Sequence, residues 1–301
     1  MTFTLDLGSR GIDPRLCLRM GQVFRFQCLP DGSLIGAEGS LVLGLKEEQE
    51  GIWTVQTNGR QSDGEAFFRL DTPPVDVFRS CLELDPRLAA HFELLQARLT
   101  LLRPTSFVEA VFGFLCSQNN HLARIMPMVQ HLGRLGEPIW EFQGQMVHAF
   151  PSLEVLAEVS EASLKGAGFG YRAAHVPAAA SRILELGGES WLESLRTCEY
   201  EEAVSALVGL PGVGRKLAEC ILLYGAGRTE SVPVDTHLWR MAAPLYLAEE
   251  AHLPNSPARS ARLSKEMRER FGPLAGWAHL LLFASSLGQG PSKTLLGQMN
   301  P

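Results

Sequence analysis

The sequence has no cysteines at the spacing that metal sites use. Six cysteines occur in 301 residues, and no two of them form a Cys-x-x-Cys pair; they are Cys17, Cys28, Cys81, Cys116, Cys198 and Cys220. Zinc sites and iron–sulfur clusters are usually held by closely spaced cysteine thiolates. We therefore expect reduced thiols, no metal site and no cluster.

Long apolar runs are also absent from the sequence. The longest lies around residues 280–284, whereas a helix that crosses a bilayer needs about 20 apolar residues. Residues 1–6 carry neither the basic nor the apolar region of a signal peptide. With 46% hydrophobic and 20% charged residues, the composition is that of a globular protein. We expect an intracellular protein without a membrane partner, built from one large or two ordinary domains.

Excess positive charge is the third absence. Lys and Arg total 27 against 33 Asp and Glu, which gives a net charge of −6 and an isoelectric point near 5.8. This balance does not by itself indicate a polyanionic partner. The chain also has no internal repeat and no low-complexity tract, so a repeat architecture is not expected.

The patterns that are present divide the chain into two parts. In the first part, alternating stretches at 40–45 and 52–56 predict strands of a small antiparallel sheet, and 63–71 and 85–99 predict helices that cover it. From residue 106 onward helical periodicity dominates, and the predicted helices are 107–116, 120–135, 152–159, 171–186, 190–195, 200–208, 215–224, 236–246, 256–271 and 275–286. We predict an α+β fold made of an antiparallel-sheet domain at 1–102, a mainly helical domain at 103–290 and a C-terminal tail at 291–301.

A glycine hairpin, Pro211-Gly212-Val213-Gly214, lies between two of these predicted helices. Proline ends the first helix, while glycines reach positive φ and leave backbone N–H groups uncovered. The next helix then starts with unpaired N–H groups and the positive end of its dipole, which together bind a phosphate without reading sequence. An ordinary turn between two helices would contain the same residues, so the hairpin alone does not decide between the two interpretations.

Lys216 and Asp235 stand at the starts of two successive predicted helices. The helix dipole and the neighbouring Arg215 should both lower the pKa of Lys216, and a neutral lysine can form a Schiff base with a sugar carbon that becomes an aldehyde. Asp235 has the position of an N-cap residue, and such a carboxylate could also stabilise a cationic sugar transition state. The alternatives are a solvated surface lysine and a plain helix cap.

Taken in order, these residues resemble the signature of the helix-hairpin-helix DNA glycosylases, and more closely that of the 8-oxoguanine DNA glycosylase/AP lyases. The signature consists of the hairpin, the lysine and a later Pro-Val-Asp, here Pro233-Val234-Asp235. Further stretches that match in the same order are 21–26, 116–124, 168–172 and 276–283. The resemblance spans nearly the whole chain, with the helix-hairpin-helix motif at about 200–240. It implies an enzyme of base-excision DNA repair that flips 8-oxoguanine out of duplex DNA, removes it and cleaves the abasic site by β-elimination through a lysine Schiff base.

The resemblance also implies a pocket for the extruded base. The backbone carbonyl of Gly21 would accept a hydrogen bond from N7–H of 8-oxoguanine, and in guanine N7 is itself an acceptor. Cys220 and Phe283 would sandwich the base. His279 stands where the close family has a glutamine that reads the base edge, which leaves the lesion range and the opposite-base preference open. A simple turn at Gly21 and ordinary core packing of Cys220 and Phe283 are the alternatives.

Other residues would hold the rest of the duplex. The resemblance places Asn119 in the position that the flipped base vacates, beside residues that contact its former partner: Arg124, Arg172 and the wedge Tyr171. Gly212, Gly214 and His237 would bind phosphates, and His121 replaces a third asparagine of the family. Helix capping by Asn119 and Asn120, surface charge for the arginines and a core position for His237 are the alternatives. The reaction needs neither a metal nor an organic cofactor. The implied partner is double-stranded DNA that contains oxidised guanine, bound by a monomer.

A DNA partner requires the charge to be unevenly distributed. We therefore expect six basic residues to converge on one face: Arg103, Arg124, Arg172, Arg215, Lys216 and Arg240. Three other functions remain open. A monofunctional alkyl-base glycosylase of the same fold should lack Lys216, and a non-catalytic helix-hairpin-helix binding module would need neither Lys216 nor Asp235. A Schiff-base enzyme that acts on small metabolites would lack the hairpin.

Overall fold

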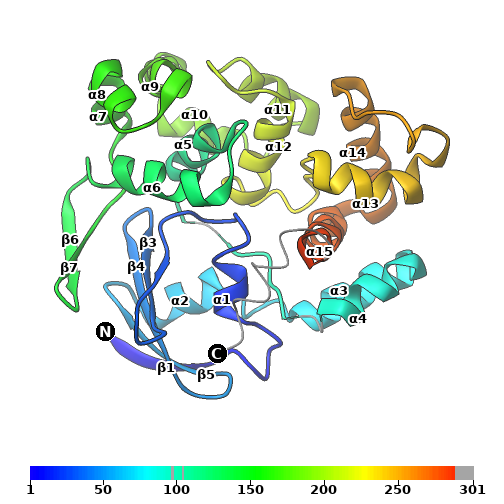
Figure 1. Cartoon of the computed structure of the whole chain (residues 1–301), viewed down its shortest axis with the longest axis horizontal. Coiled ribbons are helices and arrows are strands. Elements are labelled where there is room, and N and C mark those ends of the chain that lie inside the picture. The colour runs from blue at the N-terminus through cyan, green and yellow to red at the C-terminus, as the bar shows by residue number, and fades with distance from the viewer. Residues whose placement is uncertain (96–97, 104, 289–301) are drawn as a thin grey trace.

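The computed structural model describes residues 1–95, 98–103 and 105–288. Its N-terminal part contains an antiparallel sheet of five strands in the order β1-β5-β4-β3-β2 (Figure 1). The strands are β1 (Thr2–Asp6), β2 (Gln27–Cys28), β3 (Leu34–Glu38), β4 (Leu41–Gln49) and β5 (Ile52–Thr57). This arrangement confirms the α+β prediction and both strands that alternation predicted.

Both faces of the sheet are covered because its apolar residues alternate. Leu43 and Leu45 of β4 face the main hydrophobic core, whereas Val42 joins a second cluster with Ile35 and Ala37. This second cluster is covered by a two-stranded hairpin of β6 (Pro138–Phe142) and β7 (Gln145–His148), visible at the left of Figure 1.

The β6–β7 hairpin lies in the mainly helical part of the chain and was not predicted from the sequence. Its turn residues Gln143 and Gly144 have φ values of +48° and +77°. Positive φ at both central positions gives the primed turn that matches the twist of paired strands. Phe142 of this hairpin packs over the position of Gly44, where a Cβ would come within 2.7 Å of the ring.

Helices of the N-terminal part meet the C-terminal end of the described chain. They are α1 (Pro14–Cys17), α2 (Gln61–Phe67), α3 (Pro74–Leu84) and α4 (Ala89–Leu95). Helix α3 was not predicted from the sequence, although Pro74 stands at its first position and Phe78 and Cys81 form a buried stripe on it. Figure 1 shows α15 (Ala275–Gly288) between α3, α4 and the helical part, and α15 contacts both helices.

The rest of the chain is a stack of helices, which agrees with the predicted periodicity. They are α5 (Phe107–Ser117), α6 (Leu122–Gly133), α7 (Leu153–Glu158), α8 (Glu161–Gly166), α9 (His175–Leu186), α10 (Glu189–Ser194), α11 (Tyr200–Val208), α12 (Arg215–Tyr224), α13 (Thr236–Tyr246) and α14 (Pro257–Phe271). Helix α8 was not predicted, and the predicted helix 171–186 begins instead with a 3-10 segment, η2 (Gly170–Ala174). None of the helices in the described ranges is both long and apolar enough to span a membrane.

One hydrophobic core joins the two predicted domains, since it runs from Leu5 and Trp53 to Leu281 without a break. The domain boundary at 102/103 stays a prediction, and the predicted tail at 291–301 lies outside the described residues.

A buried ion pair ties the first loop of the chain to the helical part. Arg25 donates from Nε and Nη2 to the Glu109 carboxylate at 2.8 and 2.6 Å, and from Nη1 to the carbonyl of His148 at 2.8 Å. The backbone N–H of Gly39 donates to Glu109 at 2.7 Å. The carboxylate and the guanidinium therefore hold the segment after Gly21 against α5, which positions that segment at the edge of the cavity described next.

Candidate active site

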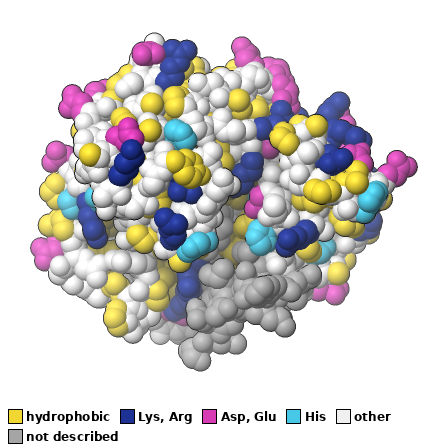
Figure 2. All heavy atoms as spheres, turned by 45° about the horizontal axis from the view of Figure 1, so that its top comes forward, with side chains coloured by type: hydrophobic (Ala, Val, Ile, Leu, Met, Phe, Trp, Pro, Cys, Tyr) yellow, Lys and Arg dark blue, Asp and Glu magenta, His cyan; other side chains and the backbone are white. Residues whose placement is uncertain are grey.

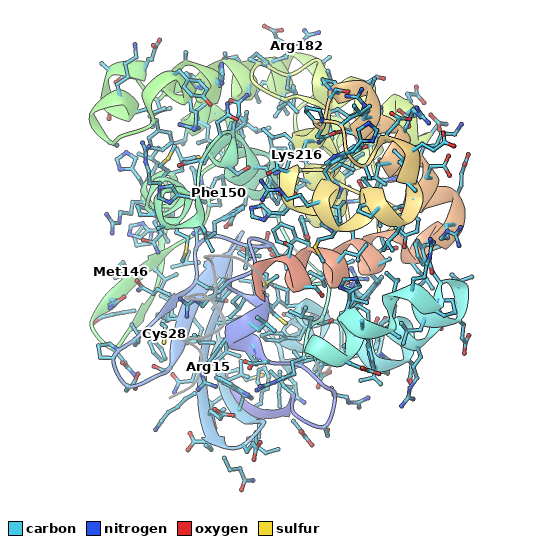
Figure 3. All side chains as sticks on the ribbon, turned by 45° about the vertical axis from the view of Figure 1, so that its right-hand side comes forward. Arg15, Cys28, Met146, Phe150, Arg182 and Lys216 are labelled. Carbon is cyan, nitrogen blue, oxygen red and sulfur yellow. The ribbon has the colours of Figure 1, made fainter. Side chains whose placement is uncertain are left out.

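A cavity of about 300 Å³ opens between the N-terminal part and the helices. Four separate segments supply its walls: the loop before Phe24, the α5–α6 connection, α12 with the start of α13, and α15. Figure 3 labels Lys216 near the middle of the molecule, where these segments meet. Seven predicted site residues line the cavity together, namely Gly21, Lys216, Cys220, Asp235, His237, His279 and Phe283.

The glycine hairpin has the conformation that the sequence predicts at only one of its two glycines. Gly212 has φ +82°, whereas Gly214 has φ −95° and is the N-cap of α12. Gly214 has no side chain to cap the helix, so the first N–H groups of α12 receive no cap from it. The expectation of positive φ at both glycines is therefore wrong for Gly214, which serves as an open helix start instead.

Lys216 lies in the first turn of α12 and is partly buried. Attraction to the Cys220 sulfur is the largest cause of a raised pKa at Lys216; burial opposes the shift and the Asp235 carboxylate adds to it. The prediction of a lowered pKa is wrong. Burial raises the pKa of the Cys220 thiol to about 11, so the thiolate that attracts Lys216 forms only in the basic range where a lysine itself titrates.

Arg215 does not depress the pKa of Lys216 because its charge is neutralised elsewhere. Its guanidinium pairs with Glu201 of α11 at 2.8 Å and with Glu219, one turn along α12, at 3.1 Å. Ser264 of α14 donates a further hydrogen bond to Glu219 at 2.9 Å. The residue next to Lys216 thus anchors α12 to its neighbours and is not part of the cavity wall.

Asp235 caps α13 as predicted. Its Oδ1 accepts a hydrogen bond of 2.8 Å from the backbone N–H of Leu238. The carboxylate lies in the same cavity as Lys216, and within the described ranges no ion pair joins the two side chains. Structural capping therefore accounts for one oxygen of Asp235 and leaves the group at the cavity wall.

The pocket predicted for the base contains a cluster of rings. Gly21 has φ +76°, and no described heavy atom lies within 4 Å of the place where a Cβ would stand, so its backbone borders open space. Cys220 follows Lys216 by one helical turn and is buried. Phe283 stacks on His279 with ring centroids 5.8 Å apart and meets His237 edge-on at 6.2 Å.

His279 is a neutral buried histidine. Its side chain is 4% exposed, and burial lowers its pKa to about 4. The positive charge of Lys216 also lowers this pKa, whereas Asp235 and a hydrogen bond to the backbone of Pro233 raise it. Its Nδ1 is buried and finds no hydrogen-bond partner among the described residues. At neutral pH the ring therefore offers one donor and one acceptor and no charge.

The residues predicted to replace the flipped base are grouped around the α5–α6 connection. Asn119 is exposed and has φ +45°, an uncommon conformation outside glycine. Tyr171 is 50% exposed, and its hydroxyl donates to the carbonyl of Gln118 at 3.3 Å. The guanidinium of Arg124 is exposed and lies 3.5 Å from the carbonyl of Gly168. Neither asparagine is the N-cap of α6, which is His121. Asn120 does cap the end of α5, since its Nδ2 donates to the carbonyl of Cys116 at 3.1 Å.

Arg172 is buried against the loop that carries Asn119. Its side chain is only 5% exposed, and it donates from Nε to Gln118 at 2.9 Å and from Nη2 to the carbonyl of Asn119 at 3.1 Å. Arg172 is therefore not surface charge, and in this structure its guanidinium supports the Asn119 loop.

Of the six basic residues predicted to converge on one face, only Lys216 lines the cavity, and three others are paired with carboxylates or buried. Their convergence on one face stays a prediction. Arg103 pairs with Asp71 at 2.9 Å, Arg215 pairs with two glutamates and Arg172 is buried. Figure 2 shows a hollowed region of the surface with Lys, Arg and His side chains around it. The cavity itself is bordered by Arg19, His121 and His237.

Some cavity residues were missed in the sequence. Tyr224 follows Lys216 and Cys220 at the next i, i+4 step of α12, so helical spacing could have identified it. Arg19 is two residues before Gly21 and had no signal except that proximity. Phe114 packs on Tyr224 with ring centroids 5.6 Å apart, a contact between separate helices that the sequence does not encode locally.

Comparisons with known proteins identify the family of this chain. Residues 112–268 match the family model described as HhH-GPD superfamily base excision DNA repair protein. The chain is 41% identical over 235 residues to the N-glycosylase/DNA lyase OGG1 of Arabidopsis thaliana, covering 76% of this chain and 62% of that relative. The chain thus spans less than two thirds of that relative's length.

Solved structures have the same architecture. The structure of MBOgg1 in complex with a low-affinity DNA ligand matches with a TM-score of 0.79 and 26% identity, covering 92% of both chains. The 8-oxoguanine glycosylase/lyase of Clostridium acetobutylicum, in complex with double-stranded DNA that has cytosine opposite 8-oxoG, matches with a TM-score of 0.78. Its identity of 24% over 91% of both chains supports the fold alone.

Proposed function

Because the chain belongs to the HhH-GPD superfamily of base excision DNA repair proteins, we propose that it is a bifunctional DNA glycosylase and abasic-site lyase that removes 8-oxoguanine from duplex DNA. The observation that carries this proposal is the presence of Lys216 and Asp235 in one cavity of about 300 Å³ that begins at the hairpin helix α12. A lysine nucleophile distinguishes a lyase from a glycosylase that only releases the base.

The reaction begins with a flipped nucleotide, since a base within the duplex is out of reach of any side chain. Asp235 stabilises the positive charge that develops on the deoxyribose as the bond from C1′ to the base breaks. The bonding electrons leave with the base, which takes up a proton. The raised pKa of Lys216 means that it enters as an ammonium, so we assign that proton to Lys216. The free amine then bonds to C1′.

The second stage cleaves the strand. The C1′–O4′ bond opens as C1′ and Nζ of Lys216 form a Schiff base, and O4′ takes up a proton. The iminium acidifies the hydrogens on C2′, so loss of one of them expels the 3′ phosphate by β-elimination. Water then hydrolyses the Schiff base and returns Lys216. No step requires a metal or an organic cofactor.

Recognition of the base is assigned to the residues around Phe283. The carbonyl of Gly21 accepts from N7–H of the lesion, and an unpaired buried acceptor against guanine costs about 1–3 kcal/mol. Cys220 and Phe283 hold the two faces of the base, and His279 meets its edge as a neutral ring. His279 offers a different pattern of donors and acceptors from a glutamine. We therefore assign to His279 the choice of which damaged bases the pocket accepts.

The remaining predicted residues hold the duplex. Asn119 fills the vacated position, Tyr171 wedges beside it, and Arg124 and Arg172 contact the orphaned base. Arg172 must release Gln118 and Asn119 to do so. Gly212, Gly214 and His237 bind phosphates, and the protein acts as a monomer on DNA inside the cell.

Borohydride trapping tests this proposal directly. Borohydride reduces the Schiff base between Lys216 and C1′ to a stable amine, so wild-type protein should form a covalent adduct with duplex DNA that contains 8-oxoguanine. Lys216→Gln should lose the adduct, whereas Lys165→Gln, which removes an exposed lysine paired with Glu161, should keep it. Base release without an adduct would identify a monofunctional glycosylase, and binding without base release would identify a DNA-binding module. Cytosine, adenine, guanine and thymine placed opposite the lesion measure the opposite-base preference.

A further inference from the structure

His175 lies in direct contact with the phosphate-binding hairpin. It is the first residue of α9, and its ring packs against the backbone of Gly212. A Cβ added at Gly212 would come within 2.5 Å of Nδ1 and 2.7 Å of Cγ of His175. The absence of a side chain at Gly212 therefore makes room for this imidazole as well as permitting positive φ.

The imidazole also contacts the residue predicted as the wedge. The ring of Tyr171 lies 5.9 Å from that of His175, with 74° between the planes, which is an edge-to-face pair. Tyr171 belongs to η2, the 3-10 segment that leads directly into α9. One side chain thus touches both the hairpin and the wedge, although Tyr171 and Gly212 are separated by about 40 residues of sequence.

The same contacts continue to the loop that carries Asn119. The Tyr171 hydroxyl donates to the Gln118 carbonyl at 3.3 Å, and Arg172 donates to the Asn119 carbonyl at 3.1 Å. Hairpin, wedge and Asn119 loop are therefore joined by packed side chains and hydrogen bonds in the order Gly212, His175, Tyr171, Gln118. Such a chain of contacts can transmit a displacement between its ends if they have two arrangements.

His175 makes these contacts by packing. Its Nδ1 is buried and has no hydrogen-bond partner among the described residues. An aromatic ring without nitrogen can therefore replace its shape and its edge-to-face pair, whereas a small side chain cannot.

We propose that His175 is a positioning residue that couples the grip of the hairpin on the DNA backbone to the insertion of Tyr171 and Asn119 into the duplex. This inference rests on the proposed function. When the hairpin binds a phosphate, its backbone is fixed, and the imidazole packed on Gly212 then fixes the turn that carries the wedge. Steps that require a base to be extruded depend on His175, and chemistry at a site that has already lost its base does not.

The test compares two substrates with the full chain. One duplex contains 8-oxoguanine and the other an abasic site, and single-turnover rates of adduct formation are measured on both. From the energy of an aromatic pair, His175→Ala should lower the rate on 8-oxoguanine by about 3–10-fold and leave the abasic rate within about twofold. His175→Phe should restore the rate on 8-oxoguanine and leave the abasic rate unchanged. The emission of 2-aminopurine rises when the base unstacks. With 2-aminopurine placed beside the lesion, the rise in fluorescence on binding should therefore be smaller for His175→Ala than for the wild type.

A matched control is His131→Ala. It removes another edge-to-face pair, with Phe169 at 5.8 Å, on the α6 side of the same turn. It should leave the ratio of the two rates as in the wild type. In a Tyr171→Ala background, His175→Ala should add less than about twofold, because coupled residues do not act additively.

The outcomes separate the two proposals. A wild-type protein without any adduct rejects the proposed function. An active wild type with unchanged His175→Ala rejects the coupling. If His175→Ala lowers the rate equally on both substrates, His175 only stabilises the fold. The same conclusion follows if His175→Ala lowers the rate as much in the Tyr171→Ala background as in the wild type.

Discussion

The imidazole of His279 lies parallel to the ring of Phe283, with centroids 5.8 Å apart and 13° between the planes. The two residues are one turn apart on α15, so both rings project from the same side of the helix. His237, from the start of α13, meets Phe283 at 80°. The wall of the cavity opposite Lys216 is thus built from rings on two helices, and its polar character depends on whether His279 carries a proton.

The buried state of His279 predicts a pH-dependent stability. Its pKa is about 4 in the folded protein against 6.5 in an unfolded chain. Between these values the unfolded state binds a proton that the folded state does not, so the free energy of unfolding falls as the pH falls, with a slope of up to about 1.4 kcal/mol per pH unit from this group. The stability that is lost in acid through this group is fully present above pH 6.5.

Urea unfolding of the wild type and of His279→Gln over this pH range measures that slope. Other titrating groups act in both proteins, including Glu219 with a pKa raised by burial to about 7, and they cancel in the difference. The wild type should lose stability relative to His279→Gln as the solution becomes more acidic. Parallel curves for the two proteins would contradict a neutral buried His279.

Asp235 should show separate contributions from its cap and its charge. Asparagine caps a helix about as well as aspartate, whereas alanine loses about 0.5–2 kcal/mol. Asp235→Asn should therefore unfold at nearly the wild-type urea concentration, and Asp235→Ala at a lower one. Both should release 8-oxoguanine far more slowly than the wild type if the carboxylate stabilises the transition state.

The charge of Asp235 has a further consequence for Lys216. Because Asp235 helps to raise the pKa of Lys216, Asp235→Asn should move the basic titration in the adduct-formation profile to lower pH. Full activity in Asp235→Asn would mean that the residue is only a cap.

Local signals in the sequence predicted much of the site, and long-range contacts account for what they missed. The cap at Asp235 and the hairpin at Gly212 depend on a few neighbouring residues, so their residue types were sufficient. Arg215 pairs with Glu201 across the hairpin, which requires the antiparallel packing of α11 on α12. Its second partner, Glu219, stands at i+4, and that spacing could have been read from the sequence.

The errors in the fold have similar causes. The β6–β7 hairpin has only short strands, and Gln143 is an unusual residue for its turn. Helix α3 has Pro73 as its N-cap and Pro74 as its first residue, and this helix start was not used in the prediction. The burial of Arg172 could not be predicted, because nothing in its sequence neighbourhood specifies the carbonyls of Gln118 and Asn119 as its partners. Contact between His175 and Gly212 likewise exists only after α9 has packed beside the hairpin.

Removing one partner of the buried pair of Arg25 and Glu109 should lower the free energy of unfolding by a large amount. Both side chains are about 5% exposed. Arg25→Ala leaves an uncompensated buried carboxylate, and breaking a pair in this way costs about 3–5 kcal/mol. Arg60→Ala is the control, because Arg60 is exposed and pairs with Asp63 at 3.5 Å, a kind of contact worth about 0–1 kcal/mol. Urea unfolding measures both, and equal effects of the two substitutions would contradict the buried pair.

Substitution of Gly212 should lower the stability through backbone strain and through a clash with His175. A control substitution at Gly227, which has the strain without the clash, separates the two causes. Gly212→Ala places an alanine at φ +82° and drives its Cβ into His175, while Gly227→Ala meets similar backbone strain at φ +70° with no described heavy atom within 4 Å. The strain alone costs about 1–2 kcal/mol in either variant. Gly212→Ala should lose more, and it should also bind undamaged duplex DNA more weakly, because the displaced hairpin presents its N–H groups poorly.

Fluorescence anisotropy with labelled duplex at several salt concentrations measures that affinity. Gly227→Ala should bind like the wild type, and the addition of His175→Ala should recover part of the stability that Gly212→Ala loses, since it removes the atoms that the new Cβ meets. If the two glycine variants are equally destabilised and His175→Ala recovers nothing, the imidazole is not packed on the hairpin, and Gly212 is required for its backbone conformation alone.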